Sequence, residues 1–81
     1  MSNLKAHGIN TQLLSEETIS FIDSKTGPIG DALCRTIDRD IDTYTRLISV
    51  RGPGQYSGLV EELNNNAEAH FNNLVLKGYQ S

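Results

Sequence analysis

PIGDALCRTIDRDIDTYTRLISV, residues 28–50, is the stretch of sequence that decides the fold. When successive residues are placed about 100° apart, its apolar side chains fall within an arc of roughly 140°, and its charged side chains fall mostly opposite. This is the helical period and not the period of two residues that a strand requires, so the stretch predicts an amphipathic helix. The apolar arc contains Ile29, Leu33, Cys34, Ile37, Ile41, Tyr44, Leu47 and Ile48.

A shorter helix is predicted on the N-terminal side, over about residues 15–26. Ser15 is a favourable N-cap, and the two glutamates that follow it suit the positive end of a helix. The pair Gly27-Pro28 is expected to end this helix, because Pro28 suits the first position of the next one.

A third helix is predicted on the C-terminal side, over about residues 57–77. The segment RGPGQ, residues 51–55, consists of turn-forming residues, and Ser57 is the expected N-cap. Gly78 suits the left-handed conformation that often follows the last helical turn. Because the turn is short, the helices over 28–50 and 57–77 are expected to form an antiparallel hairpin, with the first helix on its open side. The predicted fold is therefore all-α.

The chain has room for one helical domain, residues 1–81, in which residues 1–13 are expected to be a flexible arm because they show no helical period. A core of this size stabilises a fold only modestly, and the single cysteine excludes an intramolecular disulfide. Self-association is the remaining source of stability, so a homo-oligomer, a dimer or larger, is expected. The residues predicted to form its interface have the 3-4-3-4 spacing of a helix–helix seam. They are Cys34, Ile37, Ile41, Tyr44 and Ile48.

The charge balance gives no footprint for nucleic-acid binding, since the chain has 7 basic and 10 acidic residues and a net charge of −3. No apolar run approaches the roughly 20 residues of a membrane span, so no membrane partner is expected. The N-terminal residues lack the apolar core of a signal peptide. With one unpaired cysteine, the expected compartment is the cytoplasm.

No metal site or cofactor is predicted. The two histidines and the cysteine, at positions 7, 34 and 70, lack the spacing of a zinc site. The acidic run over residues 38–42 invites a calcium-loop interpretation, but such a loop needs Gly and Glu where this chain has Thr43 and Ser49. The run lies within the periodic helix, so its charged side chains are expected to form a solvated face.

Asp40 and His70 interrupt the apolar faces of the second and third predicted helices. Counted from Gly54 in the turn, they lie at similar heights in an antiparallel hairpin, so one interpretation is a structural hydrogen bond. A second is a polar centre at the base of a binding groove, and a third is that the two half-exposed residues never meet. An acid–base role is the weakest interpretation, because no nucleophile is placed beside the pair, and we expect no enzyme activity.

Two glycine-containing loops hold the ingredients of an anion site. Lys25 and Thr26 precede the second helix, whose first N–H groups suit an anion. Arg51, Gln55 and Tyr56 precede the third helix, where Arg51 suits a phosphate and Tyr56 suits a base. Since the loops lie at opposite ends of the second helix, an antiparallel pair of subunits would combine them into two equivalent pockets. The alternative is that both loops are ordinary breaks between helices.

Two functions of different classes are therefore expected. The first is a small, non-enzymatic, homo-oligomeric protein that binds and modulates a partner protein, because the apolar stripe is wide for so short a chain. The alternative is a protein that binds or sequesters a small anionic ligand, such as a nucleotide, at the inter-subunit glycine-loop pockets.

Overall fold

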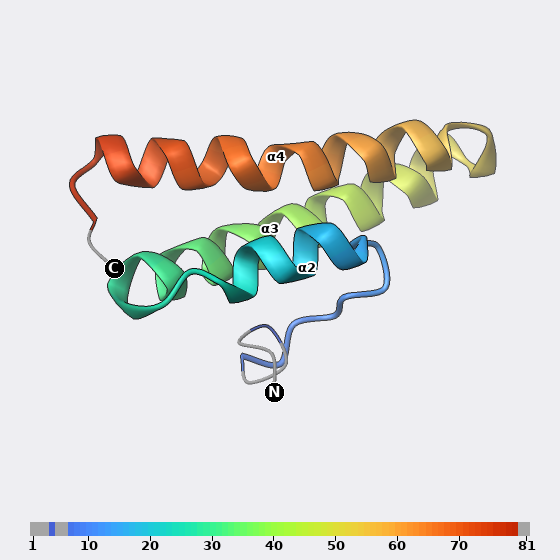
Figure 1. Cartoon of the computed structure of the whole chain (residues 1–81). Coiled ribbons are helices and arrows are strands. Elements are labelled where there is room, and N and C mark those ends of the chain that lie inside the picture. The colour runs from blue at the N-terminus through green and yellow to red at the C-terminus, as the bar shows by residue number, and fades with distance from the viewer. Residues whose placement is uncertain (1–3, 5–6, 80–81) are drawn as a thin grey trace.

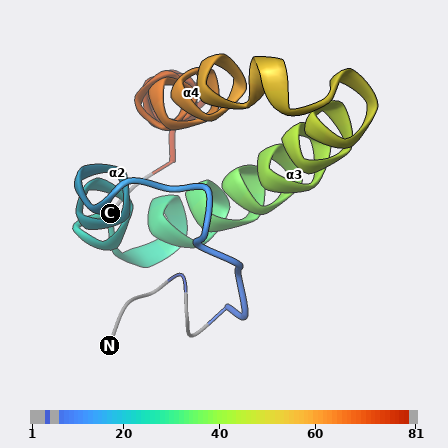
Figure 2. The ribbon, with the colours of Figure 1, turned by 90° about the vertical axis from the view of Figure 1, so that its right-hand side faces the viewer.

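The computed structural model describes Leu4 and residues 7–79, and in this part of the chain the fold is all-α. The helices are, in chain order, α2 (Glu16–Asp23), α3 (Gly27–Arg51) and α4 (Tyr56–Leu76), and a short 3-10 turn, η1 (Pro53–Gln55), joins the last two. Figure 1 shows that α4 runs in the direction opposite to α3, while α2 lies beside both. In the side view of Figure 2, the helices surround one interior.

Apolar side chains from every helix fill this interior. Ile22 of α2, Leu33 and Ile37 of α3, and Leu63 of α4 have no solvent exposure. Those of α3 and α4 lie on the apolar faces that their sequence patterns predict, so burial of these faces holds the helices together. Full burial of each such side chain contributes about 1.5–3 kcal/mol before the cost of ordering the chain.

The described residues before α2 contribute to the same interior, whereas the sequence predicts a flexible arm over residues 1–13. Leu4 is fully buried and Ile9 nearly so, and the Ile9 N–H donates to the Leu4 carbonyl at 3.0 Å. His7 Nε2 lies 3.3 Å from Asp31 Oδ1 of α3. Helical periodicity could not predict these contacts, because two isolated apolar side chains reach the core from an irregular segment. Residues 1–3 and 5–6 lie outside the described part.

The residues predicted to form an oligomer interface are buried inside the single chain. Cys34, Ile37, Ile41 and Tyr44 keep at most 8% of their surface exposed, and Ile48 packs partly buried against the same core. The four buried side chains face the chain's own interior and are not available to a second copy, so their assignment is corrected, while Ile48 keeps partial exposure. Self-association stays a prediction, but the apolar stripe on which it was based is largely covered by the chain itself.

The start of α2 is the one that the sequence predicts. The Ser15 hydroxyl accepts the N–H of Thr18 at 3.2 Å, which confirms Ser15 as the N-cap. The helix ends at Asp23 and not at residue 26, because the chain leaves the helical path before Gly27, whose φ is 73°. A left-handed backbone of this kind favours glycine.

The corner between α2 and α3 depends on Gly30, in the first turn of α3. The carbonyl group of Lys25 passes so close to Gly30 that a Cβ atom there would collide with it. Because backbone and not a flexible side chain occupies this space, the corner requires glycine. Gly30 therefore sets how closely α2 approaches α3.

The turn between α3 and α4 lies where the sequence predicts, but the N-cap residue of α4 is not the predicted one. Gly52 has a φ of 84°, and its N–H donates to the Ile48 carbonyl at 2.9 Å. α4 begins at Tyr56 with Gln55 in the N-cap position and no side-chain cap. Ser57 lies within the first turn and is not the cap, because η1 leads directly into the helix.

The end of α4 is formed as the sequence predicts. Gly78 has a φ of 93°, and its N–H donates to the Val75 carbonyl at 3.0 Å. The Tyr79 N–H donates to the Leu74 carbonyl at 3.2 Å. The two bonds form a Schellman motif, which satisfies carbonyl groups that the helix end would leave unpaired.

Candidate functional site

Asp40 and His70 meet across the seam between α3 and α4. The His70 Nε2 and Asp40 Oδ2 atoms lie 2.7 Å apart, and the two side chains are 26% and 20% exposed. The two residues are at similar distances from the turn in the sequence and lie at the same height along the paired helices, as the count from Gly54 predicts. Among the described residues, no hydroxyl or thiol group bonds to His70, so the pair lacks the nucleophile that a hydrolytic triad needs.

A second polar cluster crosses the same seam at Tyr44. The Tyr44 hydroxyl donates to Glu62 Oε1 at 2.8 Å and accepts from Asn66 Nδ2 at 3.0 Å. Burial, reinforced by the hydrogen bond to Glu62, raises the pKa of Tyr44 above its ordinary value of 10.0. Glu62 and Asn66 are not among the residues predicted from the sequence, although a tyrosine on an apolar stripe requires a partner for its hydroxyl.

Asn64 of α4 fixes the position of α2. Its Oδ1 accepts the Ser15 N–H at 2.8 Å, and its Nδ2 donates to the Leu13 carbonyl at 3.0 Å. The same Nδ2 lies 2.7 Å from the Val60 carbonyl, one turn earlier in α4. One amide therefore binds the backbone where the chain enters α2, which holds α2 beside α4. The sequence gives no signal for this role beyond a short run of asparagines.

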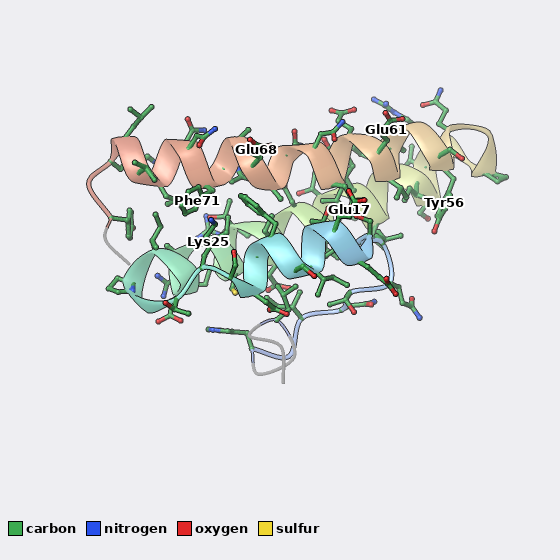
Figure 3. All side chains as sticks on the ribbon, viewed as in Figure 1. Glu17, Lys25, Tyr56, Glu61, Glu68 and Phe71 are labelled. Atoms are coloured by element: carbon green, nitrogen blue, oxygen red, sulfur yellow. The ribbon has the colours of Figure 1, made fainter. Side chains whose placement is uncertain are left out.

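An open groove lies between α2 and α4, with a volume of about 420 Å³. Exposed polar side chains stand at its mouth, and both polar and apolar side chains, Thr18, Asn64, Phe21 and Ala67, lie partly or fully buried beneath them. Figure 3 shows Glu17 on α2 and Glu68 on α4. The lining includes Glu17 and Phe21 of α2 and Asn64, Asn65, Ala67 and Glu68 of α4. This groove is not predictable from the sequence, because it depends on how α2 packs against α4.

An aromatic pair adjoins the groove. The rings of Phe21 and Phe71 meet edge to face, with centroids 5.8 Å apart and an interplanar angle of 86°. The Nζ atom of Lys25 lies 4.8 Å from the Phe21 ring centroid and 4.5 Å from that of Phe71. Figure 3 shows Lys25 and Phe71. Both distances suit a cation–π interaction. Lys25, predicted to hold an anion, thus has its ammonium over two rings.

The other residues of the predicted anion site are not brought together within one chain. Arg51 and Gln55 line a separate hollow of about 340 Å³, which Glu62 also lines. Tyr56 lines a third hollow, of about 290 Å³, with residues of α3 and of the N-terminal segment. Thr26 lies before the opposite end of α3, at its N-cap position, where its side chain makes no capping bond. A composite pocket between two subunits stays a prediction.

The remaining candidate chemistry lies elsewhere. Among the described residues, no group of three or more His, Cys, Asp or Glu side chains is placed to hold a metal ion. Asp42 of the acidic run pairs with Arg46 at 3.0 Å on the exposed side of α3. Burial raises the pKa of the Cys34 thiol, which suits an unreactive core residue. Within the described part, no helix combines the length and apolarity that crossing a membrane demands.

Comparisons with protein-family models, with curated proteins and with solved structures give no match for this chain.

Proposed function

We propose that this protein is a non-enzymatic binding protein that captures and modulates a partner protein at the groove between α2 and α4. The observation that carries the proposal is the groove itself, about 420 Å³ of open space beside a core filled by the chain's own side chains. Ligand sites typically measure roughly 300–1,000 Å³, so this groove accommodates a few side chains of a partner.

The groove is preformed, which favours binding. Asn64 ties α4 to the backbone of Leu13 and Ser15, immediately before α2, through bonds of 2.8 and 3.0 Å. Because α2 is already held in place, a partner does not bear the entropic cost of ordering it.

The polar groups of the α3–α4 seam support binding over catalysis. His70 and Asp40 bond to each other, and the Tyr44 hydroxyl bonds to Glu62 and Asn66. Among the described residues, no hydroxyl or thiol group bonds to His70, so the pair has no nucleophile to activate. Their role in the proposal is to hold α3 and α4 in register.

To test the proposal, one variant places a bulky side chain in the groove. Its capture of a partner is compared with that of a matched control variant. Asn65 is exposed and lines the groove, so Asn65→Trp obstructs it. Thr43 is exposed on α3, and Thr43→Trp adds the same side chain elsewhere. We expect the immobilised wild-type and Thr43→Trp proteins to capture a partner from extracts of the source cells, and Asn65→Trp to lose it.

The captured partner is then purified and its Kd for the three proteins is measured. Equal affinity for Asn65→Trp and the wild type would overturn the proposal, provided that circular dichroism shows both to be folded. The two finer predictions are tested on the same samples. Light scattering reports whether the mass exceeds that of one 81-residue chain. A thermal-shift assay with nucleotides, using Lys25→Ala and Arg51→Ala, tests the alternative of an anionic ligand.

A further inference from the structure

A hollow of about 290 Å³ lies where the segment before α2, α3 and the start of α4 meet. We call it the Tyr56 hollow, after the first residue of α4, which Figure 3 labels. None of its described lining residues also lines the groove between α2 and α4, so it is a separate site. These lining residues are Asn10, Gln12, Leu13, Thr45, Ile48 and Tyr56.

The described lining of the Tyr56 hollow carries no charge, which distinguishes it from the other two hollows. Glu17 and Glu68 line the groove between α2 and α4. Arg51 and Glu62 line the hollow at the turn. In the Tyr56 hollow, each described side chain is apolar or carries a hydroxyl or a neutral amide group. An ion that entered would lose hydration without gaining an opposite charge, so the hollow favours an uncharged molecule.

The walls of the Tyr56 hollow offer apolar surface that water still reaches. Tyr56 keeps 44% of its surface exposed, and Leu13 and Ile48 are partly buried. Binding of an apolar ligand removes this surface from water, which favours the complex. The Tyr56 ring further favours an aromatic ligand, because aromatic rings gain from offset or edge-to-face contact. The volume is near the lower end of the roughly 300–1,000 Å³ of ligand pockets, so the ligand has one or two rings.

The polar side chains of the hollow define the rest of the ligand's chemistry. Asn10 Oδ1 accepts the Gln12 N–H at 2.9 Å, which orients the Asn10 amide, and Gln12 adds a second amide beside it. The Thr45 hydroxyl donates to the Ile41 carbonyl at 2.7 Å, so toward a ligand its oxygen is an acceptor. Each amide presents a donor and an acceptor side by side. A carboxamide group on the ligand has the same two groups and complements them.

We infer that the Tyr56 hollow binds a small uncharged aromatic carboxamide, whose ring contacts Tyr56 and Ile48 and whose amide pairs with the amides of Asn10 and Gln12. The inference goes beyond the proposed function, because it concerns a small molecule and a different site.

The test uses benzamide and benzoate, which have the same ring and nearly the same shape but differ in charge. Titration of the full chain, labelled with nitrogen-15 and followed by NMR, gives a Kd for each. Thr45→Trp obstructs the hollow, and Thr43→Trp adds the same side chain at an exposed position of α3 outside the described lining. Tyr56→Ala removes the aromatic wall, and Tyr79→Ala removes an exposed tyrosine elsewhere. Circular dichroism verifies that each variant is folded.

We expect benzamide to produce saturable shifts of the amide signals near Tyr56 and Ile48, with a Kd at least about tenfold lower than that of benzoate. Thr43→Trp and Tyr79→Ala should bind benzamide within a factor of about two of the wild type. Thr45→Trp should lose binding, and Tyr56→Ala should bind about threefold to tenfold more weakly.

Three results overturn the inference: no saturable shift with benzamide, equal affinity for benzoate, or unchanged affinity in Tyr56→Ala and Thr45→Trp. Asn65→Trp, which obstructs the groove of the proposed function, should bind benzamide as the wild type does, because Asn65 is not among the residues that line the Tyr56 hollow. The two proposals therefore succeed or fail separately.

Discussion

Across the seam of the two long helices, the Nε2 atom of His70 lies 2.7 Å from the Oδ2 atom of Asp40. About three-quarters of each side chain is shielded from solvent. Without its partner, each polar group would therefore be desolvated and unpaired. This pair belongs to the scaffold of the groove, and its contribution to stability is measurable.

We expect His70→Ala and Asp40→Ala each to lower the free energy of unfolding by about 1–3 kcal/mol, because each leaves a partly buried polar group unpaired. The double variant should lose less than the sum of the two, with a coupling of about 0.5–3 kcal/mol. Urea denaturation monitored by circular dichroism gives these values. Additive losses would show that the two side chains do not stabilise each other.

Tyr44→Phe removes the hydroxyl that joins Glu62 and Asn66, and we expect a loss of about 0.5–1.5 kcal/mol. The pKa of Tyr44 is raised in the folded protein, so its contribution is complete below pH 10.0, the ordinary value. Above that pH the unfolded chain releases this proton first, and stability falls until the raised pKa is passed. Denaturation between pH 9 and 12 should show a steeper decline for the wild type than for Tyr44→Phe.

Gly30→Ala is expected to destabilise the protein by about 1–3 kcal/mol, because the new Cβ atom would collide with the Lys25 carbonyl. Helix propensity alone predicts the opposite sign, a gain of up to about 1 kcal/mol. Gly58, within α4, has open space around the position of a Cβ atom, so Gly58→Ala should show that gain. Thermal unfolding compares the two, and equal changes would exclude a steric role for Gly30.

Asn64→Ala removes the amide that holds the entry to α2 and should cost about 1–3 kcal/mol. Hydrogen exchange should then accelerate at the Ser15 amide and through α2, while the middle of α3 stays protected. Asn64→Asp keeps an acceptor for the Ser15 N–H, so it should preserve more of that protection. Uniform acceleration across all helices would mean that Asn64 stabilises the whole fold and not α2 in particular.

The helices were predictable because their signals are local. The apolar period of α3, the Ser15 cap and Gly78 each act within a few residues, and the structure confirms all three. Ser57 failed as a cap because the outcome depended on η1, whose geometry the turn residues do not specify.

The surface was less predictable, since it depends on packing between distant segments. The stripe containing Ile37 and Ile41 was expected to face a second copy, yet α2, α4 and the buried Leu4 and Ile9 enclose it. The groove follows from contacts of Asn64 with the entry to α2, 49 and 51 residues away in sequence. Neither periodicity nor spacing contains that information.

The burial of Cys34 makes the rate at which its thiol is labelled a measure of how often the core opens. Its thiol is 1% exposed and is the only one in the chain, and burial raises its pKa, so a thiol reagent reacts with it only when the helices part. The labelling rate of unmodified wild-type protein thus reports how often the interior opens. A partner that binds both α2 and α4 should slow this labelling, whatever the partner's identity.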